Sequence, residues 1–231
     1  MPAASPNTTE PAAPAEEAHG RRERLLREAT RIFAAKGFDK ASTREICQAA
    51  DANIGLISYY FGDKKGLYRE ALIQPILELL AHVPLADASV PLRDWLEGFY
   101  AALLMPLRKA DSELAHLMRL LGREMMEPTP AYEELCARHI APQHEALIEM
   151  LRQRCGVAAG PGPDMGLQHL AHALTALAHD YWMSADYMET LAPGVARGPG
   201  AYERVLDRLV GYGQALIEHE TARRRLQGGQ Q

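Results

Sequence analysis

Residues 42–68 read STREICQAADANIGLISYYFGDKKGLY. Ser42 is followed three residues later by Glu45, and this capping box predicts the start of a helix. Asn53 is a good N-cap for a second short helix, and Gly62 is a residue that ends one. Because two short helices joined by a three- or four-residue turn form a helix-turn-helix, we predict that motif here.

Helices are also predicted on both sides of this stretch. An apolar stripe at helical spacing precedes it, and Gly37 ends that helix. After it, Asp63 can cap a helix that runs to about His82, in which Pro75 predicts a kink. The residues of the apolar stripe are Leu25, Ala29, Ile32 and Phe33.

The charge of the chain is unevenly distributed. The 231 residues carry a net charge of −5, yet residues 21–73 hold eleven Lys and Arg against seven Asp and Glu. A basic segment on an acidic body can still meet a polyanion, because only the docking face needs positive potential. By charge alone, ordinary fluctuation explains the excess equally well.

The chemistry of the motif suits DNA. The start of its first helix offers free N–H groups and the hydroxyls of Ser42 and Thr43 to a phosphate. The second helix is expected to expose one face, made of Ile54, Gly55, Ser58 and Tyr59, opposite the packing residues Leu56, Ile57 and Phe61. Tyr59 and Tyr60 can contact phosphates or base edges, and Lys64 and Lys65 can neutralise flanking phosphates. The alternative is that the capped helices and paired tyrosines serve packing alone.

Residues 21–68 resemble the N-terminal domain of TetR-family transcriptional regulators. The resemblance implies a three-helix DNA-binding head on a larger helical ligand-binding and dimerisation body. The matching elements are Arg24-Leu25-Leu26, Ala29, Phe33-Ala34, Gly37-Phe38, Ser42-Thr43-Arg44-Glu45-Ile46, Ala49, Gly55, Tyr59-Tyr60-Phe61, Lys64 and Leu67-Tyr68.

By position, the resemblance also implies roles for individual residues. Phosphate contacts fall on Ser42, Thr43, Tyr59, Tyr60 and Lys64. Base contacts fall on Arg44, Asn53, Ile54, Gly55 and Ser58. The sequence departs from the family pattern at Cys47, at Tyr60 and at Gly62-Asp63. Ile54 and Ser58 leave few hydrogen bonds for reading bases.

The fold class expected for the whole chain is all-α. Residues 1–20, rich in Ala, Pro, Thr and Glu, are expected to form a disordered arm. We place the head at 21–66, the body at 67–226 and a flexible tail at 227–231. Within the body, long helical segments are expected at about 91–109, 112–126, 129–155, 164–190 and 201–226.

A second resemblance covers part of the body. Residues 122–132, GREMMEPTPAY, and residues 140–144, IAPQH, are similar to TetR-family proteins with a CerR/CecR-type C-terminal domain. This resemblance implies a repressor that a small molecule relieves, often one that controls transport or drug tolerance.

The body also offers candidates for a dimer interface. The TetR resemblance assigns the last two long helices to a four-helix bundle between two chains, and a homodimer can read a pseudo-palindromic operator in double-stranded DNA. The same residues could instead be intrachain core. They are Leu170, Leu174, Leu177, Tyr181, Leu206, Leu209, Gly213 and Leu216.

An effector pocket is the second expectation for the body. Its candidates mix aromatic, soft apolar and a few polar side chains, as small-molecule cavities do. The effector would then be a largely apolar molecule, aromatic compounds included, although each residue taken singly could be core. The candidates are Trp95, Phe99, Met105, Met118, Arg119, Glu124, His144 and Trp182.

Other classes of function find little support. Residues 160–163, GPGP, lack the Lys-Ser/Thr ending of a phosphate-binding loop, and no GxSxG or HExxH motif occurs. His169, His172 and His179 are loosely spaced for a metal, and the three cysteines form no zinc or disulfide pattern. No apolar run nears roughly 18 residues, so we expect no membrane partner. The cysteine pattern fits a reduced cytosol, so we expect a cytoplasmic protein. We also expect no cofactor.

Two alternatives to a ligand-released repressor remain open at this point. One is a DNA-binding protein of the same fold without an effector, acting through protein interaction or as an architectural factor. The other is a small-molecule enzyme.

Overall fold

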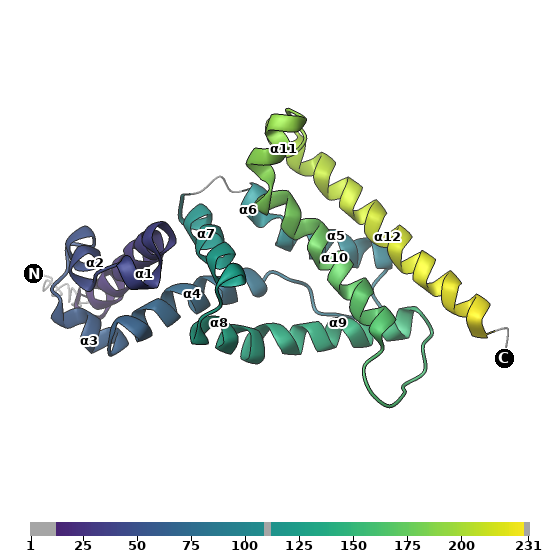
Figure 1. The fold of residues 1–231 in the computed structure, drawn as a ribbon, viewed down its shortest axis with the longest axis horizontal. Coiled ribbons are helices and arrows are strands. Elements are labelled where there is room, and N and C mark those ends of the chain that lie inside the picture. The colour runs from purple at the N-terminus through teal and green to yellow at the C-terminus, as the bar shows by residue number, and fades with distance from the viewer. Residues whose placement is uncertain (1–12, 109–111, 229–231) are drawn as a thin grey trace, which may run out of the picture. The chain divides into compact units, whose positions relative to one another are not determined.

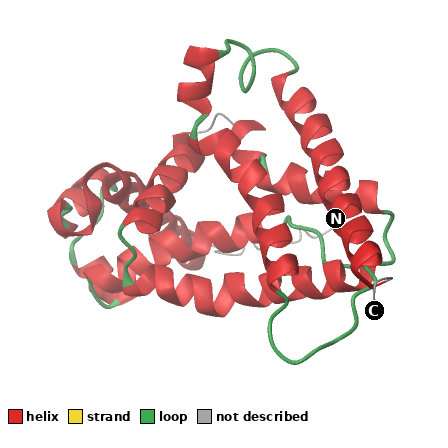
Figure 2. Ribbon diagram, turned by 45° about the vertical axis from the view of Figure 1, so that its right-hand side comes forward, coloured by secondary structure: helices red, strands yellow, loops and turns green. Residues whose placement is uncertain are grey.

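Every regular element in the described part of the chain is a helix, which confirms the all-α expectation (Figures 1 and 2). The computed structural model describes residues 13–108 and 112–228. The chain divides inside one helix, between Ala71 and Leu72, into two units.

The first unit contains the predicted helix-turn-helix. Its helices are α1 (Ala13–Lys40), α2 (Thr43–Ala49), α3 (Gly55–Phe61) and the start of α4 (Lys64–Leu80). Their core includes the expected stripe of α1, since Leu25, Ala29, Ile32 and Phe33 are all buried. The ring of Tyr68 on α4 meets that of Phe33 edge-on, at 4.8 Å between centroids.

Part of the expected arm and part of the expected tail are helical. Residues 13–20 already belong to α1, because Ala and Glu are strong helix formers and a proline at position 14 is tolerated in a first turn. Gly37, with φ of 77°, breaks the helix at the point where we expected it to end. At the other end α12 continues to Gly228. Residues 1–12 and 229–231 of the expected arm and tail lie outside the described residues.

The second unit contains the rest of α4 and all later helices. These are α5 (Leu92–Leu103), α6 (Met105–Arg108), α7 (Ser112–Met126), α8 (Pro130–Leu135), the π-helical turn η1 (Cys136–Ile140), α9 (Ala141–Arg154), α10 (Met165–Met183), α11 (Ala185–Leu191) and α12 (Ala201–Gly228). No helix in the described ranges is long and apolar enough to cross a bilayer.

Three of the expected long segments are interrupted. The segment 91–109 breaks at Leu104, two residues before Pro106, which has no N–H to donate. The segment 129–155 contains η1, which ends two residues before Pro142, and Ala141 N–H bonds there to the carbonyl of Cys136. The segment 164–190 breaks at Ser184, whose N–H and hydroxyl both bond to the carbonyl of Asp180, at 2.8 and 2.7 Å.

The core of the second unit takes up much of the apolar surface that we assigned to a dimer. Leu174 and Leu209 have no exposed surface in the single chain, and Leu170 is buried as well. Gly213 lies against α5, so that a Cβ there would sit 2.9 Å from Leu96 Cδ2 and 3.0 Å from Tyr100 Oη. These four positions are therefore part of the intrachain core, which is the alternative that the sequence had left open for them. Leu177, Tyr181, Leu206 and Leu216 are only partly buried.

An ion-pair network joins the start of α10 to the end of α12. Asp164 caps α10 by accepting from Leu167 N–H at 3.0 Å. Its carboxylate also accepts two bonds from the Arg224 guanidinium, at 2.7 and 2.8 Å. These bonds hold the pKa of Asp164 well below its usual range. Glu220 accepts from both Arg223 and Arg224, which completes the network.

We predict that Gly213→Ala destabilises the chain by about 1–3 kcal/mol, because the added methyl overpacks the contact between α5 and α12. Urea unfolding followed by circular dichroism measures the effect. The matched control is Gly20→Ala, a helical glycine with nothing within 4 Å of its Cβ position. Gly20→Ala should raise the free energy of unfolding, because alanine has a higher helix propensity than glycine. An equal increase for Gly213→Ala would contradict the close packing of Gly213 against α5.

We predict that Asp164→Asn keeps the cap but loses about 1–3 kcal/mol of unfolding free energy at pH 7. Since the folded pKa is depressed, the stabilisation is complete above the ordinary carboxyl range and declines as pH falls below about 4. The difference between variant and wild type should therefore shrink in acid. The control is Asp207→Asn, whose exposed carboxylate lies 3.3 Å from Arg93. A difference independent of pH would count against the network.

Candidate DNA-binding surface and ligand pocket

The start of α2 has the predicted cap but only half of the capping box. Ser42 Oγ accepts from Glu45 N–H at 3.1 Å. The Glu45 carboxylate does not return to Ser42; it accepts from Lys36 Nζ of α1 at 2.6 Å. Glu45, the second residue of the expected capping box, therefore links α2 to α1. Ser42 and Arg44 are exposed and Thr43 is partly so, which leaves the start of α2 open at the surface.

The turn between α2 and α3 is tight. Asp51 has a φ of 49°, a left-handed conformation that Asp tolerates better than most residues. Ala52 N–H then reaches back to the carbonyl of Cys47 at 2.9 Å. Asn53 caps the following helix as predicted, because its Oδ1 accepts from Gly55 N–H at 2.8 Å.

Helix α3 divides into a buried and an exposed face. Ile57 and Phe61 are buried against the unit, and Leu56 is half-buried. The opposite face carries Tyr59, with 79% of its surface exposed, and Ile54, with 50%. Asn53, Gly55 and Ser58 are exposed as well. The half-buried Tyr60 meets Tyr59 edge-on, at 5.0 Å between ring centroids.

A glycine that we did not single out places α3 against α4. A Cβ at Gly66 would lie 1.9 Å from the carbonyl oxygen of Phe61, so no other residue fits without a shift. Gly66 N–H also bonds to Asp63 Oδ1 at 2.8 Å, which confirms the predicted cap of α4. The signal in the sequence was a glycine inside a predicted helical turn, four residues after Gly62.

The two candidate lysines have different surroundings. Lys64 is half-buried, with its Nζ 4.5 Å from the centroid of the Phe38 ring and 3.4 Å from the carbonyl oxygen of Asp39. Lys65 is exposed. Lys64 therefore helps to hold the segment after Gly37, whereas Lys65 presents its charge to solvent. Contact of either lysine with DNA stays a prediction.

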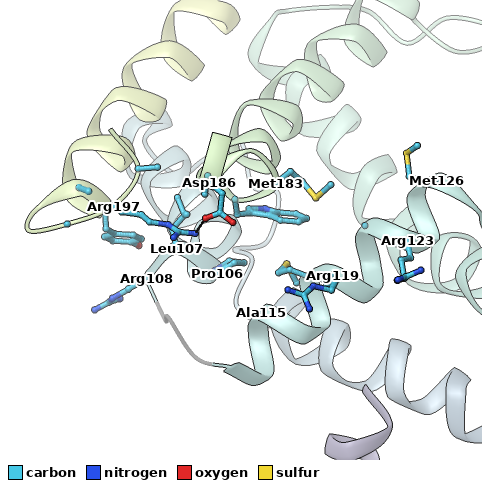
Figure 3. A pocket seen from close by; sticks show the side chains of 18 of the residues that line it. Pro106, Leu107, Arg108, Ala115, Arg119, Arg123, Met126, Met183, Asp186 and Arg197 are labelled. Atoms are coloured by element: carbon cyan, nitrogen blue, oxygen red, sulfur yellow. Dashed lines mark ion pairs between the residues drawn. The ribbon is translucent and has the colours of Figure 1, made fainter. Parts of the chain in front are cut away.

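The second unit contains a hollow of about 1210 Å³ between α6, α7, the end of α10, the start of α11 and the start of α12 (Figure 3). Three of the eight predicted pocket residues line it: Met118, Arg119 and Trp182. The other lining residues are Pro106, Leu107, Arg108, Ala115, Gly122, Arg123, Met126, Glu127, Met183, Ala185, Asp186, Ala196, Arg197, Gly198, Ala201, Tyr202 and Glu203.

Five predicted pocket residues lie elsewhere. Trp95 is buried and donates its indole N–H to the carbonyl of Leu85 at 3.0 Å. Phe99 stacks on Trp95 within the core. Met105 does not line the hollow. The apolar face of α5 therefore packs within the chain. The sequence pattern could not distinguish such a core-facing side from the wall of a pocket.

The two polar residues of that group also have structural partners. The buried carboxylate of Glu124 accepts from both N–H and Oγ1 of Thr129 at 2.9 Å, and this fixes the turn into α8. His144 Nε2 lies 2.6 Å from Gln168 Oε1, which connects α9 to α10. Neither residue lines the hollow.

The histidines of α10 do not form a metal site in the structure. Within residues 13–108 and 112–228, no three His, Cys, Asp or Glu side chains gather at a suitable spacing. Burial and the neighbouring His172 lower the pKa of His179, which favours its neutral form.

Comparison with known proteins adds two family matches. Residues 25–71 match the model of bacterial regulatory proteins of the tetR family. Residues 92–212 match the C-terminal domain of the HTH-type transcriptional dual regulator CecR.

Individual proteins show the same similarity. The Shigella flexneri transcriptional dual regulator CecR is 29% identical over 130 residues, covering 52% of this chain but only 58% of that protein. A tetR-family regulator from Streptomyces coelicolor has a similar fold, with a TM-score of 0.60, 20% identity and coverage of 91% and 86% of the two chains. A transcriptional regulator from Rhodococcus sp. Rha1 also has a similar fold. Its TM-score is 0.59 and its sequence identity 24%, and the match covers 83% of this chain and 94% of that chain.

We predict that Lys65→Ala weakens binding to every DNA sequence and lowers the slope of log K against log salt by about 0.9. The physical reason is the loss of one phosphate contact and its released counterion. Fluorescence anisotropy at several salt concentrations measures the slope. Arg138→Ala removes an equal charge from η1 in the second unit and serves as the control. An unchanged slope for the lysine variant would place Lys65 away from the DNA.

Proposed function

Because the chain belongs to the TetR family of bacterial regulatory proteins, with a CecR-type C-terminal domain after the helix-turn-helix, we propose that it is a homodimeric repressor that a small molecule releases from a pseudo-palindromic operator. The chain is a DNA-binding transcriptional regulator and not an enzyme. The mode of regulation, the dimer and the effector are the proposed part.

The observation that carries the proposal is the exposed face of α3. A capped seven-residue helix that leaves Ile54, Ser58 and Tyr59 in solvent has the size and shape to enter a major groove. Gly55 adds no side chain, so the backbone can approach the bases closely. Phosphates on either side would meet the open start of α2 and the exposed Lys65.

A dimer follows from the small size of this surface. One short helix in one half-site makes few base contacts, whereas two heads one helical turn apart read a palindrome with summed affinity. The partly buried residues that the core leaves on α10 and α12 supply the proposed interface: Leu177, Tyr181, Leu206 and Leu216. Tyr212 of α12, which is 49% exposed, adds to it.

Release by a ligand would act through α4. This helix begins in the first unit and ends in the second, so it joins the head to the body that holds the hollow. A ligand shifts the DNA equilibrium only by its difference in affinity between the two conformations, typically 1–3 kcal/mol. The similar CecR protein is described as a dual regulator, and we extend that possibility to this chain at promoters where the operator position favours activation. Because the proposed operator lies on chromosomal DNA, the proposed location of the protein is the cytoplasm.

We predict that selection from a random DNA duplex pool, at salt near physiological, recovers a pseudo-palindrome with two half-sites. Tyr59→Ala should then weaken binding to the selected site and to random duplex alike, since the family pattern gives this exposed residue of α3 a phosphate contact. Tyr187→Ala, an exposed tyrosine of α11, is the matched control. Recovery of no motif, with only salt-sensitive binding, would overturn the repressor proposal.

A further inference from the structure

We propose that the hollow beside α7 binds an amphipathic anion, with an apolar ring system against Trp182 and Met118 and a carboxylate-like group on Arg119. This inference rests on the proposed function, in which the same hollow is the effector site. It goes further by assigning a charge to an effector that the sequence suggested only as largely apolar.

The charges around the hollow are unequal. Four arginines and three acids line it: Arg108, Arg119, Arg123 and Arg197 against Glu127, Asp186 and Glu203. One arginine is already neutralised, since Arg197 Nη2 lies 2.5 Å from Asp186 Oδ1. A second, Arg108, lies over the ring of Tyr202, with Cζ 5.5 Å from its centroid. Of the four, Arg119 on α7 therefore supplies the positive charge available to a ligand.

Arg119 is the group best placed to receive an anion. Within the ranges 13–108 and 112–228 it has no hydrogen-bond or ion-pair partner. Figure 3 shows Arg119 and Arg123 along α7, one turn apart, with the Asp186–Arg197 pair on the opposite wall. A planar guanidinium without a partner matches the two oxygens of a carboxylate, and such bidentate bonds are among the strongest in proteins.

The rest of the hollow suits an apolar body. Met118 lies next to Arg119 on α7, and Trp182 and Met183 line the hollow from the end of α10. Gly122 lets Met183 pack closely against α7, because the Met183 Cε atom lies 3.5 Å from where a Cβ would be. Methionine side chains adapt their shape to a flat or irregular ligand. The volume of about 1210 Å³ exceeds the usual range for drug-sized sites.

This arrangement predicts discrimination by charge. A neutral molecule of the same shape would leave the Arg119 guanidinium without a counter-charge, and a cation would be repelled by it. Affinity should therefore follow the order anion, neutral, cation at a constant ring system.

The test is calorimetric titration of the full chain with three naphthalene probes of one size: 2-naphthoate, 2-naphthalenemethanol and 2-naphthylmethylammonium. We expect 2-naphthoate to bind about tenfold more tightly than the alcohol, and the ammonium compound most weakly. Arg119→Gln should remove the preference for the anion, while Arg119→Lys keeps part of it. Arg138→Gln, an exposed arginine of η1 outside the hollow, should change nothing.

A spectroscopic readout locates the probe. The chain has two tryptophans, and Trp95 is buried in the core away from the hollow. Energy transfer to bound 2-naphthoate should therefore come mainly from Trp182 and largely vanish in Trp182→Phe. Arg119 is exposed, so its variants should keep the unfolding midpoint of the wild type.

The outcomes separate this inference from the proposed function. Equal affinity for the acid and the alcohol, unchanged by Arg119→Gln, would overturn the anion proposal and leave an apolar effector pocket standing. Binding of none of the three probes would also overturn it, while recovery of an operator would still support the repressor. Anion binding that persists in Arg119→Gln would place the charge contact elsewhere and reject the assignment.

Discussion

A helix of seven residues is too short to be stable in water, and this constraint governs the whole head. Helix α3 exists because its neighbours hold it. Asn53 satisfies an N–H at its start, Gly62 turns the chain at its end, and Ile57 and Phe61 anchor its inner face. Gly66 then lets α4 approach the carbonyl of Phe61. The exposed face can be free for DNA because the opposite face and both ends are fixed.

The second unit meets a different demand, because its helices must pack together and still leave surface for other tasks. Helices α5 and α12 meet closely at Gly213, and the Asp164–Arg224 bonds tie the end of α12 to the start of α10. Leu174 and Leu209 are fully buried in the core of the same unit. A proposed partner chain is left with the half-buried positions, and a ligand with the hollow at the other end of α10.

The polar side chains of the second unit also differ in whether they have a partner inside the chain. Glu124 and Trp95, which resemble pocket residues by type, are satisfied inside the chain by Thr129 and by the carbonyl of Leu85. Arg119 has no such partner among the described residues, and it lies beside apolar side chains in the hollow. A polar group that the fold leaves unpaired at a hollow is a better guide to a ligand than residue type alone.

The sequence by itself determined the local events. The caps at Ser42, Asn53 and Asp63 and the helix breaks at Gly37 and Gly62 appear where we predicted them, because each depends on a few neighbouring residues. The order and spacing of these events identified the head and its family. The tertiary structure alone decided which apolar stripe became core and which residues line the hollow. The lining comes from four separate stretches of the sequence, 106–108, 115–127, 182–186 and 196–203, and helical periodicity gives each helix an apolar face without saying what that face will meet.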